Sequence, residues 1–215
     1  MAKDGIGILI AVLLPTVLFS VISIINYSHP IIMVAGFGWL FSFFIVYFFR
    51  DPERSIPNDE NVILSPGDGK VVQITEVDEN TYLQSKARQV SIFLSVFDVH
   101  INRIPISGKV GYFSYIKGKF LQAFRPEASI VNEQTIIGIE NHNCKILFKQ
   151  IAGILARRIV CNIREGFAVE RGKRFGMIKF GSRVDVLMPL DVEIMVTKNQ
   201  KVKGGETVIG KYATK

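Results

Sequence analysis

A glycine followed by a serine, Gly181-Ser182, is the pair of residues whose types and spacing permit the most specific chemistry in this chain. A serine hydroxyl next to a glycine carbonyl can attack that carbonyl, because glycine has no Cβ to block the approach and tolerates strained backbone. The pair interrupts a strand-like run, residues 174–186. Ser182 is therefore a place where the chain could cut itself and make its own cofactor.

Histidine, the usual acid/base group, is scarce in this chain. On a strand, His100 would share one face with Asp98 and Asn102. Such a face is either exposed to solvent or carries an acid/base group with its orienting partners. The other two histidines, His29 and His142, lie in predicted turns, and we expect neither to be catalytic.

An aspartate in a tight turn is the main acidic candidate. Asp68 lies in the run Ser65-Pro-Gly-Asp-Gly, a strong turn signal. A turn aspartate is usually structural, but a buried one beside a serine can orient or activate it. The sequence has no CxxC, HxH or HExxH pattern, so we expect no metal site.

Two groups of residues could contact a lipid or an anion. Phe120 and Phe124 alternate with cations, which is typical either of an ordinary loop with a hydrophobic contact or of a loop that enters the lipid interface. The adjacent Arg157 and Arg158 could bind a phosphate by a forked contact. The cations around the phenylalanines are Lys117, Lys119 and Arg125.

Two uncharged apolar segments, residues 5–25 and 30–49, begin the chain. Each reaches the length of about 20 residues that a helix needs to cross the hydrocarbon core. The pattern predicts a membrane anchor, residues 1–49, that forms a transmembrane helical hairpin; a signal peptide and a hairpin that does not fully cross are the alternatives. Lys3, Arg50 and Arg54 flank the hairpin on one side, which predicts a cytoplasmic catalytic domain at the cell membrane.

The remainder of the chain carries the whole formal charge of +7, because Lys3 and Asp4 cancel within the anchor. A basic domain favours an anionic partner, either nucleic acid or an anionic lipid surface. A membrane anchor favours the lipid, so we expect no nucleic-acid partner.

Residues 50–61 are polar and rich in proline, which indicates a linker, and residues 62–215 alternate short apolar runs with turn residues. This pattern predicts a mainly β catalytic domain, built as a sandwich or barrel. Residues 166–172 and 199–206 resemble each other and the hairpins of lipoyl-type barrels. The strands are expected at residues 70–74, 90–96, 108–115, 135–140, 145–151, 158–163, 183–188 and 193–197, with one helical turn at 153–158.

Taken together, segments along nearly the whole chain resemble one family, phosphatidylserine decarboxylase in its short, archaeal-type form. They are FFRDPER (48–54), SPGDGKV (65–71), FDVHINR (97–103), GKFLQAF (118–124), NE (132–133), QIAGILARRIV (150–160) and RFGMIKFGSRVDV (174–186).

The resemblance implies a proenzyme that cleaves itself between Gly181 and Ser182. The serine hydroxyl attacks the glycine carbonyl to give an ester, and β-elimination releases a β chain, residues 1–181. Residue 182 becomes a pyruvoyl group on the α chain, residues 182–215, and the two chains form a heterodimer. The pyruvoyl group forms a Schiff base with the amine of phosphatidylserine, CO2 leaves, and phosphatidylethanolamine is the product. A further homo-oligomer is left open.

The chain departs from longer members of the family at two positions. They have a threonine where this chain has Arg183, and a second histidine, which serves self-cleavage, where it has Arg103. That leaves open which group takes the serine proton. Our hypothesis is that His100, supported by Asp68, serves self-cleavage, decarboxylation or both.

Two other functions fit parts of the sequence. A membrane-tethered, lipoyl-like adaptor would need no catalysis, but neither hairpin turn carries the lysine flanked by small or methionine residues that a carrier uses. A serine hydrolase with a Ser-Lys dyad would use Ser182 and Lys179, and its chain would stay whole.

Overall fold

The computed structural model describes residues 1–123, 125, 127–154, 159–179 and 181–213. The chain divides into two compact units, Met1–Pro52 and Glu53–Lys215. Each unit is described by itself.

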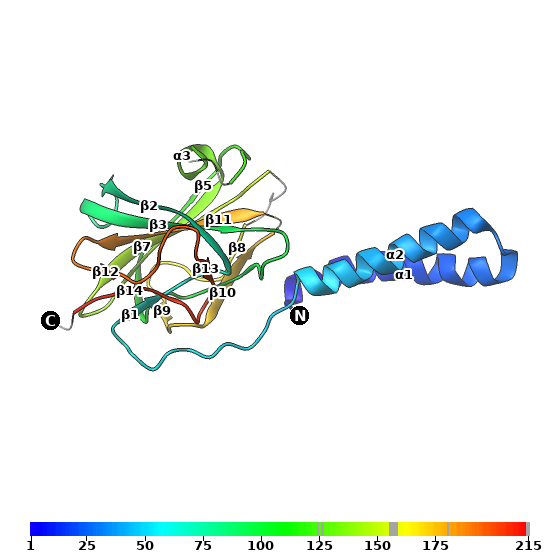
Figure 1. Cartoon of the computed structure of the whole chain (residues 1–215), viewed down its shortest axis with the longest axis horizontal. Coiled ribbons are helices and arrows are strands. Elements are labelled where there is room, and N and C mark those ends of the chain that lie inside the picture. Colours follow the sequence, from blue (N-terminus) through cyan, green and yellow to red (C-terminus); the bar gives the residue numbers. More distant parts are fainter. Residues whose placement is uncertain (124, 126, 155–158, 180, 214–215) are drawn as a thin grey trace. The chain divides into compact units, whose positions relative to one another are not determined.

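The first unit is a pair of helices, α1 (Lys3–Asn26) and α2 (His29–Phe48) (Figure 1). Tyr27 adopts a left-handed conformation at the end of α1, and its N–H donates to the carbonyl of Ser23. The helices approach closely where Gly38 faces Thr16, since a Cβ at Gly38 would collide with the threonine side chain. Both helices are long and apolar enough to cross a membrane, and they fit an association with one.

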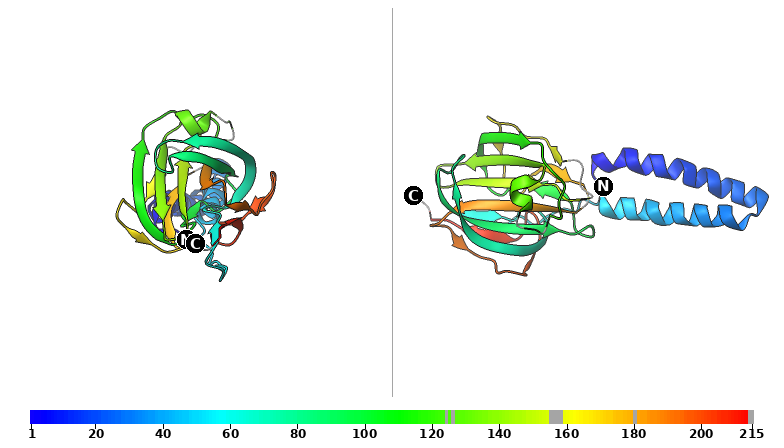
Figure 2. Two further views of the ribbon diagram at one scale, coloured as in Figure 1. Left: turned by 90° about the vertical axis from the view of Figure 1, so that its left-hand side faces the viewer. Right: turned by 90° about the horizontal axis from the view of Figure 1, so that it is seen from above.

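The second unit is built around an antiparallel sheet of eight strands, ordered β13-β2-β3-β11-β7-β6-β5-β9. Figure 2 shows this sheet curling around the core as a half-barrel. β11 lies near its middle, with β3 on one side and β7 on the other. The strands are β2 (Gly69–Glu79), β3 (Ser85–Leu94), β5 (Gly108–Ile116), β6 (Gln134–Glu140), β7 (Lys145–Ile151), β9 (Ala168–Val169), β11 (Ser182–Pro189) and β13 (Lys201–Val202).

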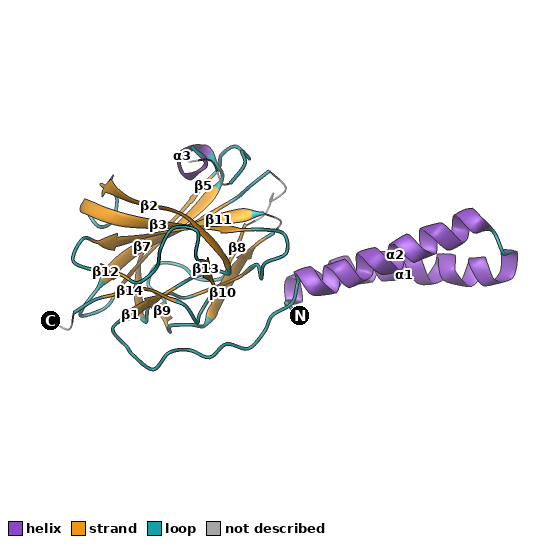
Figure 3. Ribbon diagram, in the orientation of Figure 1, coloured by secondary structure: helices purple, strands orange, loops and turns teal. Residues whose placement is uncertain are grey.

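Two sheets of three strands complete the second unit, as Figure 3 shows together with the short helix α3 (Ala128–Val131). One has the order β1-β14-β12 and the other β4-β10-β8. Their strands are β1 (Val62–Leu64), β4 (Ile101–Arg103), β8 (Ile159–Cys161), β10 (Arg174–Ile178), β12 (Glu193–Ile194) and β14 (Val208–Lys211).

The main core forms between the inner face of the large sheet and the two small sheets. On β11 the inward residues alternate as Val184, Val186 and Met188, as the two-residue period of a strand requires. The same period places Ser182 on the inner face, and it places Arg183 and Asp185 on the outer face. Ser182 and Arg183, the first two residues of β11, therefore point in opposite directions.

The mainly β fold and the apolar helical pair confirm the expected fold class. The two segments that resemble each other adopt similar turns, because each encloses a two-residue strand between residues with positive φ. Most of the helical turn expected at residues 153–158 lies outside the described residues. Six strands, β1, β4, β9, β10, β13 and β14, were not among the expected strands, although β10 lies within the strand-like run of residues 174–186.

The core between the large sheet and the two small sheets generates a prediction about stability. Phe148 on β7 is fully buried and packs edge-on against Phe175, with 5.4 Å between ring centroids. Phe148→Ala should lower the free energy of unfolding by about 3–5 kcal/mol, because it leaves a cavity. Phe167→Ala removes a half-exposed ring and should change it by about 0.5 kcal/mol or less.

Urea denaturation followed by circular dichroism measures both effects. Each chain also carries Ser182→Ala, which keeps the polypeptide whole under the self-cleavage hypothesis. Equal decreases in the free energy of unfolding for the Phe148 and Phe167 variants would contradict the placement of the core.

Candidate active site

The hydroxyl of Ser182 is buried inside the unit at the first residue of β11. The residue is inaccessible to solvent, and its Oγ makes no hydrogen bond to any described residue. Backbone pairing with Leu94 of β3 fixes its position. A buried hydroxyl without a partner costs about 1–3 kcal/mol, so it is uncommon in a purely structural position. Here it is a potential nucleophile in a dry environment.

The carbonyl next to this hydroxyl is held by close packing. Gly181 has φ +63°, in the left-handed region that favours glycine. Its carbonyl oxygen packs directly against Cα of Gly153, where a Cβ would overlap it. Gly153 follows β7, the strand beside β11, so the two glycines meet at the same end of the sheet. The pair lets the two backbones approach and fixes the direction of the carbonyl.

His100 lies on the other side of the same residue. Its Nε2 accepts a hydrogen bond of 3.4 Å from the backbone N–H of Gly181, and its Nδ1 lies 2.9 Å from the carbonyl oxygen of Asp98. Because Nε2 accepts, Nδ1 carries the proton and donates to Asp98, which assigns the neutral tautomer from the hydrogen-bond network. The fully buried imidazole thus presents an acceptor nitrogen beside the Gly181-Ser182 peptide.

The run from Asp98 to Asn102 is not a solvent-facing strand. His100 and Asn102 are both inaccessible to solvent, and β4 begins only at Ile101. The Asp98 carboxylate instead accepts hydrogen bonds from the N–H and hydroxyl of Ser95, which closes a turn. Asp98 therefore orients His100 through its backbone carbonyl, an arrangement that strand periodicity could not reveal.

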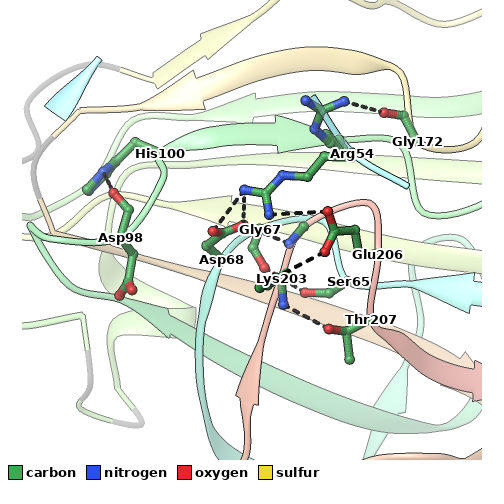
Figure 4. A network of polar contacts seen from close by, with 12 residues as sticks. Arg54, Ser65, Gly67, Asp68, Asp98, His100, Gly172, Lys203, Glu206 and Thr207 are labelled. Atoms are coloured by element: carbon green, nitrogen blue, oxygen red, sulfur yellow. Dashed lines mark hydrogen bonds and ion pairs between the residues drawn. The ribbon is translucent and has the colours of Figure 1, made fainter. Parts of the chain in front are cut away.

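Asp68 is held by residues from both ends of the unit. Nη2 of Arg54 lies 2.9 Å from each carboxylate oxygen, and the N–H of Gly204 donates to Oδ1 at 2.8 Å. Figure 4 shows the Asp68 side chain turned toward Arg54, with His100 beside Asp98. The support of His100 by Asp68 remains a prediction, because these contacts explain the position of Asp68 without it.

The Asp68 turn nevertheless lies beside the candidate site. A Cβ on Gly67 would lie 3.2 Å from the side chain of Leu94, the residue paired with Ser182. The carbonyl of Pro66 accepts a hydrogen bond of 2.8 Å from the N–H of Arg103. The fold thus brings together Ser182, His100 and the turn that carries Asp68 from three segments far apart in the sequence.

Longer members of the family that the motifs resemble carry a second histidine at the position of Arg103. Here Arg103 makes contacts that support the fold. Its guanidinium donates a hydrogen bond of 3.0 Å to the carbonyl of Gly172, and its side chain packs against Gly205. Both glycines have positive φ, and each belongs to one of the two similar turns. Arg103 therefore joins both turns to β4.

A buried asparagine that sequence reasoning missed supports the Gly153 side of the site. Asn132 donates to the carbonyls of Leu121 and Ala152, at 2.9 and 2.7 Å, and accepts a hydrogen bond from the N–H of Leu121. It fixes the residue just before Gly153. Its signal in the sequence was the Asn-Glu pair of the resemblance, which gave no role. Arg54, in the motif of residues 48–54, is a second residue that contacts the site and to which the sequence gave no role there.

The expected ligand-binding residues are only partly described. Phe120 is half-buried and packs against the main core. Phe124, Arg157 and Arg158 lie outside the described residues. No cluster of three or more metal-ligating side chains occurs within the described part of the chain.

Comparison with known proteins decides the family. The family description "Phosphatidylserine decarboxylase" matches residues 41–210, which include every residue of the site. The chain belongs to the phosphatidylserine decarboxylase family. Members of this family are carboxy-lyases, so the chain is an enzyme of this class. Membership of the family therefore excludes an adaptor without catalysis.

Similar proteins share most of the chain. A phosphatidylserine decarboxylase proenzyme of Carboxydothermus hydrogenoformans is 44% identical over 212 residues, which cover 98% of this chain and 96% of the relative. Proteins of the same name from Chlorobium phaeobacteroides and Salinibacter ruber are 51% and 49% identical over 169 and 174 residues. These cover 79% and 80% of this chain and 79% and 77% of the relatives. The resemblance inferred from the motifs is confirmed.

The contact between the two glycines gives a prediction about this decarboxylase. Under the self-cleavage hypothesis, Gly153→Ala should slow cutting at Gly181-Ser182 by about tenfold or more, because an added methyl displaces the carbonyl, and a shift of 1 Å can cost roughly 100-fold in rate. Gly36→Ala is the matched control, since no atom lies within 4 Å of its new methyl.

Cell-free synthesis followed by a denaturing gel gives the rate at which the shorter fragments appear. Cutting of the Gly153 variant at the rate of the control would show that the carbonyl needs no such fixed direction.

Proposed function

We propose that this protein is a phosphatidylserine decarboxylase that cuts its own chain at Gly181-Ser182 and acts through the pyruvoyl group left at residue 182. One observation carries the proposal. A buried serine hydroxyl without a described partner adjoins a left-handed glycine whose N–H faces the acceptor nitrogen of a buried histidine. Attack on the neighbouring carbonyl needs no external substrate, so it can take place at a buried hydroxyl.

The first step uses groups of this chain alone. Ser182 Oγ adds to the Gly181 carbonyl carbon, the peptide C–N bond breaks, and an ester with a free amine at residue 182 results. Removal of the residue 182 Cα proton then expels the Gly181 carboxylate and leaves dehydroalanine. Water replaces its nitrogen, which leaves as ammonia, and a pyruvoyl group remains. His100 accepts the serine proton in this scheme: its Nε2 exchanges the long hydrogen bond from the Gly181 N–H, 3.4 Å, for one from the serine hydroxyl.

A pyruvoyl group has fewer heavy atoms than the serine residue from which it forms, so it needs no more room than Ser182 occupies. The group would occupy the buried position of Ser182, fixed by the pairing of β11 with β3. When present it supplies a carbonyl that draws electrons from the bond to the substrate carboxylate. The protein's own part is to exclude water, orient this carbonyl and hold a proton at His100.

The substrate we propose, phosphatidylserine, would reach the site from a membrane. Phe97, Ile130 and Ile154 are 64%, 79% and 49% exposed, and each belongs to a segment that contacts the site. Cations near an anionic surface contribute about 1 kcal/mol each to its binding. With the helical pair as anchor, these features support a site that faces the anionic cytoplasmic leaflet. The exposed cations of residues 117–133 are Lys117, Lys119 and Arg125.

Self-cleavage is tested by the intact mass of the purified protein. The wild-type chain should give two fragments, residues 1–181 and residues 182–215, the second with a blocked N-terminus. Ser182→Ala removes the nucleophile and should leave one chain of 24.1 kDa that releases no CO2 from phosphatidylserine. A wild-type protein that decarboxylates while its chain stays whole would overturn the proposal. A whole, inactive wild-type chain would favour a Ser182–Lys179 hydrolase.

The role of His100 is tested against a histidine outside the site. His100→Ala should reduce self-cleavage, turnover per cut molecule or both by about 100-fold or more, as loss of a general acid or base does. His142→Ala changes an exposed turn residue and should alter neither. Fragment appearance and CO2 release measure the two steps separately. Normal values for both in the His100 variant would remove it from the mechanism.

A further inference from the structure

The residue after the cut site is an arginine buried on the opposite face of β11. Arg183 is 1% exposed and is the largest fully buried side chain in the described chain. It lies on the outer face of the sheet, so its side chain points away from that of Ser182. The self-cleavage scheme assigns it no role.

Four groups hold the Arg183 guanidinium in one orientation. Nε donates to Oδ1 of Asp185 at 2.6 Å, and Nη2 donates to the Ser91 hydroxyl at 2.7 Å. Longer hydrogen bonds reach Oε1 of Gln73 at 3.4 Å and the carbonyl of Arg125 at 3.3 Å. The contacts come from β11, β3, β2 and the segment of residues 117–133. A planar fork with this many partners fixes position far better than an apolar side chain.

The burial of this ion pair needs a reason beyond stability. Both members are essentially inaccessible, and the desolvation of two charges offsets most of their attraction. Apolar residues of similar volume commonly replace such pairs without loss of stability. A buried pair next to a bond that breaks has a more specific use.

Cutting the chain removes half of the support of residue 182. Before the cut, that residue is tethered by peptide bonds on both sides. After it, residue 182 is the first residue of a chain, and first residues fray unless they are held. Arg183 is then the first residue with peptide bonds on both sides, and its side chain links the new terminus to β3 and to β2 beyond it.

We propose that Arg183 is a positioning residue that holds the pyruvoyl-bearing terminus after self-cleavage and couples it to residues 117–133. The proposal rests on the function proposed above. It assigns Arg183 to decarboxylation and not to the cut itself, because only the cut chain needs the added support.

The coupling runs through two contacts with residues 117–133. The carbonyl of Arg125 accepts from Arg183, and the Ser129 hydroxyl donates to Oδ2 of Asp185 at 2.6 Å. The same segment is joined by Asn132 to the residue before Gly153. It carries the exposed cations and Ile130 that we propose contact lipid. Substrate binding and terminus position are thereby linked through one buried pair.

Double replacement of the pair tests the positioning role. Arg183→Met with Asp185→Leu removes both charges, so no uncompensated charge is left buried. We expect self-cleavage at nearly the wild-type rate and a fall in kcat of roughly 100-fold, as a misplacement of about 1 Å produces. The kcat is expressed per pyruvoyl group, counted by intact mass after borohydride reduction.

Three single variants sharpen the test. Arg183→Lys keeps the charge but loses the fork, and should recover part of the lost kcat. Ser129→Ala removes one of the two contacts with residues 117–133 and leaves the Arg183–Asp185 pair intact, and should raise KM for phosphatidylserine in anionic vesicles while kcat is retained. Arg88→Met changes a more exposed arginine that pairs with Glu76 on the same sheet, and should alter nothing.

Parallel loss of cutting and turnover in the Arg183 variants would show a merely structural role and overturn the proposal, as would unchanged kcat. If the double variant does not fold, Arg183→Lys decides by the same comparison of the two rates. A wild-type chain that is never cut would overturn the proposed function instead, so the two failures are distinguishable.

Discussion

The two-residue period of β11, buried on both faces, is the constraint on which the rest of this site depends. Because neighbouring residues of a strand point in opposite directions, Ser182 enters the core while Arg183 enters a polar network outside it. A register slip of one residue would exchange the two environments. Pairing with β3 and β7 fixes the register, and the site inherits its accuracy from the sheet.

Around this strand the site is assembled from segments that are short and irregular. Gly153 and His100 approach residue 181 from loops after β7 and before β4, and both are fixed by backbone carbonyls: the Asn132 amide holds that of Ala152, and the Asp98 carbonyl holds the imidazole. Hydrogen bonds to backbone carbonyls fix the orientation of Gly153 and His100 without placing a further charge in the site. The site therefore relies on geometry and exclusion of water more than on a chain of ionised groups.

The sequence predicted what local pattern controls. Long apolar segments predicted the helical pair, and runs of Val, Ile and Phe predicted most of the longer strands, because burial on one or both faces leaves a periodic trace. Strands of two or three residues leave a weaker trace: β8 and β12 were predicted, but β1, β9 and β13 were not. The Arg54–Asp68 pair and the Gly153–Gly181 contact could not be predicted, since each joins loops whose meeting depends on the whole sheet. The motifs located Ser182 and His100, but the role of Arg183 needed its burial.

The position of β11 has a consequence for how this molecule can be made. Residues 182–215 supply β11 and β13 to the large sheet and β12 and β14 to a small one. If the chain is cut as proposed, the shorter product is woven through its partner and cannot leave without dismantling both sheets. Folding of the uncut chain is unimolecular, whereas refolding of the separated products is a bimolecular search that slows on dilution. The peptide bond between Gly181 and Ser182 is thus an assembly tether, needed once and then dispensable.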